Sequence, residues 1–306
     1  MYNYFIYGKY IASDYRLEEA YEIKETEVRA DIIIKKANLK RFMERGERHE
    51  SPDLIVYWYE KEGKVYRVEH AGYMFVTSGN TIEYQLFEEC NPLMVNQMFL
   101  CAGLPMALSQ QGQMMIHGSG LLFGEKAIAV SGYSGAGKST LSQALLKNGA
   151  MFMADDTVAL VEKEGKVYAQ AAYPQQKICV DAIDETYDKK QLILLPKDAG
   201  KEKYAVRLKE GFCMEEKPLQ AMFILKAADI PEIQMRRIKG SEKLKYLTDN
   251  LYNKKIYKEV GMGIDIVKKC ISIADKIDIY LIERPMAGMS TNQQVRLVKS
   301  ALGEKM

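Results

Sequence analysis

The residues best suited to chemistry form a glycine-rich segment near the middle of the chain. Residues 132–139 read Gly-Tyr-Ser-Gly-Ala-Gly-Lys-Ser, which matches the phosphate-binding pattern G-x-x-x-x-G-K-[ST] at every fixed position. Glycines in such a loop adopt positive φ and turn backbone N–H groups toward phosphate oxygens. We expect Lys138 to reach the β- and γ-phosphates and Ser139 to offer its hydroxyl to Mg²⁺. The predicted nucleotide-binding residues are Gly132, Tyr133, Ser134, Gly135, Ala136, Gly137, Lys138, Ser139 and Thr140.

The segments on either side of the loop have the order that such a site needs. Residues 127–130 form a short apolar run typical of a strand, and residues 140–147 form a good helix. A helix that begins at the loop would direct its free N–H groups and its dipole at the bound phosphates. The alternative is a glycine-rich turn without this role, and the strand, loop and helix order argues against it.

Two adjacent acidic residues follow the next apolar run. Asp155 and Asp156 come directly after residues 151–154, and Asp155 lies 17 residues beyond Lys138. That distance fits one helix, a turn at residues 148–149 and one strand, which a crossover would place parallel to the first strand in the same sheet. Both strand ends would then open on one edge, where α/β sheets bind ligands. Two adjacent carboxylates beside phosphates repel one another and the phosphates unless a cation is present. We therefore prefer a role for the aspartates in binding Mg²⁺ to the alternative, a solvated turn after a strand.

His117 lies on another apolar segment, 21 residues before Lys138. The segment reads as a strand that neighbours the strand of the phosphate loop. The imidazole could orient a phosphate or hydrogen-bond a carboxylate, and a satisfied core histidine is the alternative.

These motifs together resemble the catalytic core of the HPr serine kinase/phosphorylase family. The similarity covers about 45 residues, from His117 to Val161, and includes the order His-Gly-Ser-Gly, Gly-Tyr-Ser-Gly-Ala-Gly-Lys-Ser-Thr and Met-Ala-Asp-Asp. The resemblance implies an α/β P-loop kinase core of the HPr kinase and phosphoenolpyruvate carboxykinase type. It implies ATP and Mg²⁺ as cofactors and catalytic roles for Asp155, Asp156, His117 and Lys138. Asp155 would accept the proton of the acceptor hydroxyl, while Asp156 would support that base or bind the metal with Ser139.

The chain departs from that family soon after the aspartates. The bifunctional members carry an Arg-Gly-Leu-Gly signature there, whereas this chain reads Gln-Ala-Ala-Tyr-Pro-Gln-Gln-Lys-Ile from residue 170. HPr is therefore in doubt as the acceptor, and so is the phosphorylase reaction. Tyr173-Pro174 and the strand-like residues 281–284 make the layout more similar to divergent members such as lasso-peptide precursor kinases.

The favoured interpretation is an ATP-dependent kinase that phosphorylates a hydroxyl group. We expect this hydroxyl to belong to a serine or threonine of a small protein or precursor peptide. Three alternatives stay open: a small-molecule kinase or carboxykinase relative, a non-catalytic nucleotide-binding module, and a transport or switch NTPase. The presence of both aspartates and of the loop lysine argues against the non-catalytic module. Arg284, Lys201, Lys203 and Arg207 are basic residues that could reach bound phosphates.

The composition of the chain indicates which classes of partner and which cellular compartment to expect. The 43 basic and 41 acidic residues are nearly balanced, so no nucleic-acid partner is expected. The five cysteines are scattered without a C-x-x-C pair, as in a reducing cytoplasm. The first residues do not read as a signal peptide, and no run reaches the roughly 18 apolar residues of a membrane helix. We expect a cytoplasmic protein with a protein or peptide acceptor and no membrane partner, and the sequence is compatible with an oligomer.

The first 90 residues read as a separate β-rich domain. Short β-branched or aromatic runs alternate there with turn residues, and Asn91-Pro92 opens a helical stretch to about residue 109. We predict a domain of residues 1–90 and a catalytic domain of residues 91–306. This first domain either recognises the acceptor or extends the kinase sheet. In the catalytic domain, residues 158–169 read as a hairpin with its turn at residues 164–165. Strands near 222–225, 233–238 and 277–282 alternate with helices near 241–253, 264–274 and 292–302.

Overall fold

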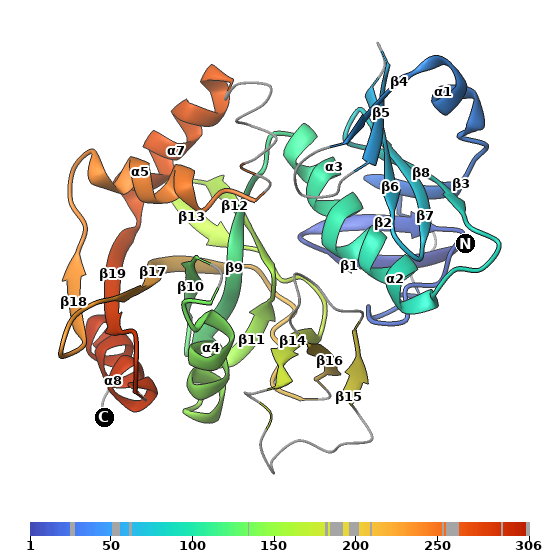
Figure 1. The fold of residues 1–306 in the computed structure, drawn as a ribbon. Coiled ribbons are helices and arrows are strands. Elements are labelled where there is room, and N and C mark those ends of the chain that lie inside the picture. Colours follow the sequence, from blue (N-terminus) through green and yellow to red (C-terminus); the bar gives the residue numbers. More distant parts are fainter. Residues whose placement is uncertain are drawn as a thin grey trace. The chain divides into compact units, whose positions relative to one another are not determined.

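The computed structural model divides the chain into two compact units, Met1–Gln113 and Met114–Met306, each described here by itself (Figure 1). It describes residues 1–24, 28–50, 56–60, 63–133, 135–180, 183, 192–195, 202–208, 210–252, 254, 263–288 and 290–303. The fold is mixed α/β with several sheets, in agreement with the coarse prediction.

The N-terminal unit is built on one eight-stranded sheet with the order β1-β2-β3-β8-β7-β6-β5-β4. Its strands are β1 (Tyr2–Ile6), β2 (Lys9–Ser13), β3 (Ile32–Lys36), β4 (Glu47–Glu50), β5 (Val56–Glu60), β6 (Gly63–Val68), β7 (Gly72–Thr77) and β8 (Thr81–Leu86). Its helices are α1 (Lys40–Arg45), α2 (Pro92–Gln97), the π-helical η1 (Met98–Gly103) and α3 (Leu104–Gln110). The predicted β-rich character of this part of the chain agrees with this sheet.

The segment α2–η1–α3 belongs to the N-terminal unit, so the division falls at residue 113 rather than near residue 90. Hydrophobic packing explains the difference. Phe99 of η1 is fully buried, and its ring lies 5.6 Å from Tyr15 and 5.0 Å from Tyr84 of the sheet. Among the described residues, Pro92–Gln110 is the one helical stretch that is long and apolar enough to cross a bilayer, and more than half of it is buried inside the protein.

The C-terminal unit holds the loop and the aspartates. Its main sheet has the order β10-β9-β12-β13-β17-β19-β18, with β11 on β9 and a further pairing of β10 with β17. These strands are β9 (Met114–Phe123), β10 (Lys126–Gly132), β11 (Met151–Ala154), β12 (Thr157–Lys163), β13 (Lys166–Ala169), β17 (Lys217–Ala228), β18 (Gln234–Arg237) and β19 (Asp278–Pro285). A separate sheet has the order β14-β16-β15, formed by β14 (Gln175–Cys179), β15 (Leu192–Leu194) and β16 (Lys203–Arg207).

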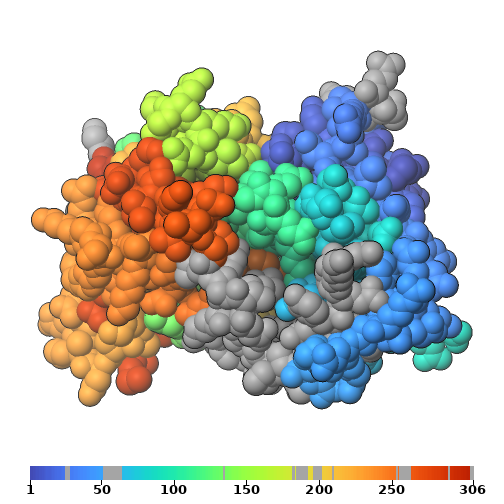
Figure 2. All heavy atoms as spheres, turned by 90° about the horizontal axis from the view of Figure 1, so that it is seen from above, coloured from blue at the N-terminus to red at the C-terminus, as the bar shows by residue number. Residues whose placement is uncertain are grey.

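Four helices belong to the part of this unit that the structure describes. They are α4 (Lys138–Lys147), α5 (Glu242–Asp249), α7 (Ile264–Lys276) and α8 (Thr291–Leu302). Helices α4 and α8 lie side by side, and α5 and α7 form a second pair (Figure 1). Figure 2 shows α7 beside the hairpin of β12 and β13, where Ser272 Oγ donates to Glu162 2.7 Å away.

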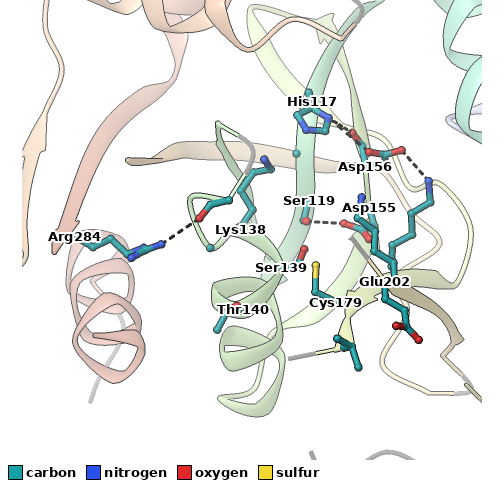
Figure 3. Close-up of a pocket in the computed structure, with 16 residues that line it drawn as sticks. His117, Ser119, Lys138, Ser139, Thr140, Asp155, Asp156, Cys179, Glu202 and Arg284 are labelled. Atoms are coloured by element: carbon teal, nitrogen blue, oxygen red, sulfur yellow. Dashed lines mark hydrogen bonds and ion pairs between the residues drawn. The ribbon is translucent and has the colours of Figure 1, made fainter. Parts of the chain in front are cut away.

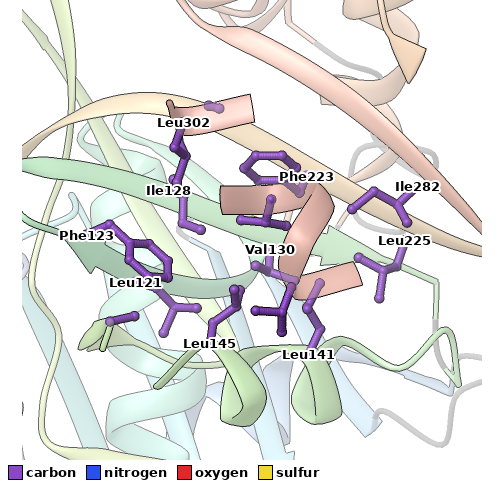
Figure 4. Close-up of a cluster of buried hydrophobic side chains, with 14 of the residues drawn as sticks. Leu121, Phe123, Ile128, Val130, Leu141, Leu145, Phe223, Leu225, Ile282 and Leu302 are labelled. Carbon is purple, nitrogen blue, oxygen red and sulfur yellow. The ribbon is translucent and has the colours of Figure 1, made fainter. Parts of the chain in front are cut away.

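A hydrophobic core holds α4 on the sheet and thereby fixes the loop that precedes it. Alternate residues of β10 and β17 face the same layer because side chains along a strand have a period of two. Leu141 and Leu145 of α4 pack with them, and α8 covers the same layer (Figure 4). The labelled members of this cluster are Leu121, Phe123, Ile128, Val130, Leu141, Leu145, Phe223, Leu225, Ile282 and Leu302.

Candidate functional site

The phosphate loop connects β10 to α4, as the sequence predicts. Gly132, Gly135 and Gly137 have φ of 136°, 79° and 100°, which side-chain-bearing residues rarely adopt. A Cβ at Gly132 would lie 2.3 Å from the Leu225 carbonyl oxygen, so the close approach of β17 also requires glycine. Of the other predicted loop residues, Tyr133 is exposed and Ala136 is buried, while Ser134 lies outside the described residues.

Lys138, Ser139 and Thr140 form the first turn of α4 and line one cavity with Gly135 and Gly137. The first N–H groups of a helix have no partner inside the helix, and the helix dipole makes this end favourable for anions. Lys138 Nζ donates to the carbonyl oxygens of Gly132 at 2.7 Å and Tyr133 at 3.3 Å. Its cationic end is therefore held across the mouth of the loop.

Strand β9 places the two aspartates opposite the loop. It pairs antiparallel with β10 along one edge and with β11 and then β12 along the other. The strands β10 and β11 are consequently parallel in one sheet, as predicted, although β9 lies between them. The predicted neighbourhood of His117 and the loop strand is also confirmed, since His117 belongs to β9.

Asp155 sits between a side-chain hydroxyl and a backbone amide. Its Oδ1 accepts from Ser119 Oγ at 2.8 Å, and its Oδ2 accepts from the Lys177 backbone N–H at 2.8 Å. Burial raises the pKa of Asp155 and the neighbouring Asp156 charge raises it further, although these hydrogen bonds and Lys177 oppose the rise. A carboxylate with a raised pKa is a stronger proton acceptor once it is ionised.

Asp156 has a different environment although it is the next residue. Burial alone would raise its pKa, but the charges of Lys177 and His117, the Lys177 hydrogen bond and Lys203 together lower the pKa to about 2. Lys177 Nζ lies 3.1 Å from Asp156 Oδ2, and His117 Nδ1 lies 3.6 Å from Oδ1. Asp156 is therefore ionised throughout the physiological range.

His117 contacts Asp156 through one ring nitrogen. Nδ1 lies 3.0 Å from the Asp156 carbonyl oxygen, which can only accept, so this ring nitrogen carries a proton. Burial lowers the pKa of His117 and Lys138 lowers it further, against the pull of Asp156. The ring is a hydrogen-bond donor to the backbone of Asp156 and lines the cavity, rather than a satisfied core histidine.

These groups converge on one cavity of about 570 Å³ (Figure 3). Its lining residues are His117, Gly118, Ser119, Gly135, Gly137, Lys138, Ser139, Thr140, Asp155, Asp156, Lys177, Cys179, Val180, Glu202, Lys203 and Arg284. All four predicted catalytic residues are in this set, and so is the predicted metal pair of Ser139 and Asp156. Of the basic residues considered from sequence, Lys203 lines the cavity, Arg207 lies on the exposed side of β16, and Lys201 lies outside the described residues.

Three contacts of the cavity were not predicted from the sequence, namely those that Ser119 and Lys177 make with the aspartates and the one that Arg284 makes with the loop. Ser119 is two residues after His117, so the strand period places both on one face, and that spacing was a usable signal. Lys177 comes from the separate sheet, and no local pattern connects it to the aspartates. Arg284 lines the cavity, and its guanidinium donates to the carbonyl oxygens of Ala136 and Gly135.

The chemistry of the donor set fits Mg²⁺. Mg²⁺ is usually held by one or two carboxylates together with waters and substrate phosphates, rather than by an all-protein cage. Asp156 is ionised and shares the cavity with the Ser139 hydroxyl. The described residues contain no group of three or more histidine, cysteine, aspartate or glutamate side chains that could hold a metal.

No protein-family model and no curated protein matches the chain. Among solved structures, the HPr(Ser) kinase/phosphatase from Coxiella burnetii is similar to 61% of this chain and 95% of its own length. The aligned residues are 12% identical, and the TM-score is 0.33. This is a distant structural relationship, so the function of this chain has to be argued from its own residues.

Proposed function

We propose that the protein transfers the γ-phosphoryl group of ATP to a hydroxyl group of a protein or peptide. The observation that supports this proposal is the shared cavity, which has a phosphate loop on one wall and two differently tuned aspartates on the other (Figure 3). Phosphoryl transfer needs mainly positioning and charge stabilisation, together with a carboxylate that receives the acceptor proton. The cavity offers all three.

Asp155 is the residue suited to receive that proton. Ser119 and the Lys177 backbone amide each bind one of its oxygens, which fixes the carboxylate and leaves a further lone pair on each oxygen. The acceptor oxygen forms a bond to the γ-phosphorus, its proton moves to Asp155, and the bond from the γ-phosphorus to the bridging oxygen breaks. ADP leaves with the electron pair.

The remaining residues stabilise the charge that develops on the phosphates. Lys138 exchanges the loop carbonyls for phosphate oxygens, and the N–H groups at the start of α4 face the same anions. Asp156 and Ser139 would hold Mg²⁺, which when bound neutralises phosphate charge. His117 donates to the backbone carbonyl of Asp156 and holds the backbone from which that carboxylate projects.

The acceptor is proposed to be a serine or threonine of a polypeptide other than HPr. The basis is the absence of the Arg-Gly-Leu-Gly signature, in place of which this chain carries the segment that becomes β14. The β-rich N-terminal unit is a second part of the chain that could recognise such an acceptor.

Labelled γ-phosphate supplies the test. The wild type, Lys138→Ala and Asp155→Asn are incubated with γ-labelled ATP and Mg²⁺ and with HPr, serine- and threonine-containing peptides, or free hydroxyl metabolites. Asp265→Asn, on the exposed first turn of α7, serves as the matched control. We expect phosphopeptides by mass spectrometry from the wild type and the control only.

The other outcomes contradict defined parts of the proposal. Rapid stoichiometric labelling of a serine of HPr contradicts the proposed acceptor. Labelling of metabolites alone supports a small-molecule kinase, and release of phosphate without any labelled acceptor supports an NTPase.

A further inference from the structure

Arg284 connects the last strand of the sheet to the phosphate loop. Its Nε donates to the Ala136 carbonyl at 2.8 Å, and its Nη2 donates to the Gly135 carbonyl at 3.2 Å. Its Nη1 donates to the Pro285 carbonyl at 2.9 Å, which holds the guanidinium against its own strand. Three of the five N–H donors of the side chain are therefore directed at carbonyl oxygens.

The sheet explains why a residue so distant in sequence reaches the loop. Strands β10, β17 and β19 are parallel neighbours, and Gly132, Leu225 and Ile282 lie at one level across them. Arg284 is two residues beyond Ile282 and therefore shares its face. Neighbouring strands are about 4.8 Å apart, so the loop lies roughly 10 Å away, within reach of an extended arginine. A Cβ at Gly137 would lie 3.5 Å from Arg284 Nε, which shows how closely the two pack.

The geometry of the peptide bond gives this contact a consequence. In a planar trans peptide the carbonyl and the N–H of the next residue point in opposite directions. A guanidinium that holds the Ala136 carbonyl on one side therefore directs the Gly137 N–H to the other side. Gly137 and Lys138 line the cavity, and Arg284 lines it at its edge, so the Gly137 N–H can meet a phosphate oxygen there.

We propose that Arg284 is a positioning residue that fixes the phosphate loop in its nucleotide-binding conformation. This inference rests on the proposed function only in assuming that the loop binds the phosphates of a nucleotide. Arg284 acts through the backbone of residues 135–137 and thus on the phosphates common to ATP and ADP. It differs from an arginine that contacts the γ-phosphate, which would act on ATP alone and on the rate of transfer.

The test measures ATP and ADP affinities by titration calorimetry for the wild type, Arg284→Gln and Arg284→Lys. Arg237→Gln is the matched control, because Arg237 Nε donates to Asp278 3.1 Å away, at the first residue of β19, whereas Arg284 lies near the last. We expect Arg284→Gln to weaken both nucleotides by a similar factor, roughly ten- to a hundredfold, from the loss of charge-assisted hydrogen bonds. Arg284→Lys recovers only part of this loss, because one ammonium cannot bind both carbonyls as a planar fork.

Two further readouts separate positioning from stability. Hydrogen exchange at the amides of residues 135–139 becomes faster in nucleotide-free Arg284→Gln, whereas exchange in α8 does not change. The kcat at saturating ATP stays within about threefold of the wild type, since the loss is in binding. Arg284→Lys keeps the charge and is measured in the same way if Arg284→Gln does not fold.

Several results would overturn the proposal. Weaker ATP with unchanged ADP affinity, or a reduced kcat with unchanged affinities, would assign Arg284 to the γ-phosphate. A lower melting temperature with unchanged affinities and loop exchange would make it a purely structural residue. A wild type that binds neither nucleotide overturns this inference and the proposed function together. A wild type that binds both but phosphorylates no hydroxyl overturns the proposed function alone.

Discussion

The ion pair of Lys177 and Asp156 gives the most quantitative prediction. The pKa of Asp156 is about 2 in the folded protein, against an ordinary value of 3.8. Each pKa unit corresponds to about 1.36 kcal/mol, so this difference represents roughly 2 kcal/mol of stability at neutral pH. The Asp156 side chain keeps 31% of its surface exposed, and solvent screening reduces the expected contribution to about 1–2 kcal/mol.

Lys177→Met removes the ammonium while keeping a side chain of similar length. We expect the free energy of unfolding to fall by about 1–2 kcal/mol at pH 7, because Asp156 then remains charged beside Asp155 without its main partner. The pKa is lowered in the folded state, so the stabilisation is complete above pH 4 to 5. It disappears as the pH falls from about 4 toward 2, where the carboxylate becomes protonated in both states.

A double-mutant cycle with Asp156→Asn isolates the pair from other effects of either substitution. Urea unfolding is followed by far-UV circular dichroism at pH 7 and pH 3, because the single tryptophan, Trp58, belongs to the N-terminal unit. The control cycle uses Lys226 and Glu283, an exposed pair 2.9 Å apart, for which we expect a smaller coupling. A Lys177 coupling no larger than that of the control, or one that is unchanged at pH 3, would refute the reasoning.

Three other predictions test the site directly. Asp155→Asn keeps ATP·Mg²⁺ binding in calorimetry but reduces the rate of phosphoryl transfer by roughly two decades or more. Because the pKa of Asp155 is raised and its ionised form is required, the kcat/KM of the wild type rises with pH through that pKa. Loss of turnover in Asp156→Asn but not in Asp155→Asn would reverse the two roles. Lys138→Ala loses measurable nucleotide binding with an unchanged melting temperature. Gly132→Ala lowers the melting temperature and abolishes nucleotide binding, because its Cβ would lie 2.3 Å from the Leu225 oxygen.

Local sequence patterns predicted the parts of the site that are built locally. The three glycines at positions 132, 135 and 137 have positive φ, the helix follows at residue 138, and the hairpin turns at residues 164–165 as expected. Each of these features depends on neighbouring residues, which periodicity and turn chemistry describe well. The insertion of β9 between β10 and β11 was not predicted, because strand order depends on packing across the whole sheet.

The contacts that complete the site come from residues far apart in the chain. Lys177 reaches Asp156 from 21 residues away, and Arg284 reaches Ala136 from 148 residues away. A lysine in an extended segment and an arginine after a strand are ordinary surface features in sequence. The boundary near residue 90 was misplaced for the same reason, since Phe99 packs against the rings of Tyr15, which follows β2, and of Tyr84 in β8.

The backbone at Asp156 explains how two adjacent aspartates can serve one cavity. Successive side chains of a regular strand point to opposite faces, so one of two neighbouring carboxylates would normally face away. Asp156 instead has φ of 66°, a left-handed conformation that aspartate tolerates better than most residues. Its carbonyl accepts from the Gly118 N–H at 3.2 Å, which holds this conformation between β11 and β12. The left-handed backbone at Asp156 therefore brings both carboxylates to the cavity. Asp155 lies in a desolvated, hydrogen-bonded environment, which suits a base, and Asp156 lies among basic side chains, which suits a metal ligand.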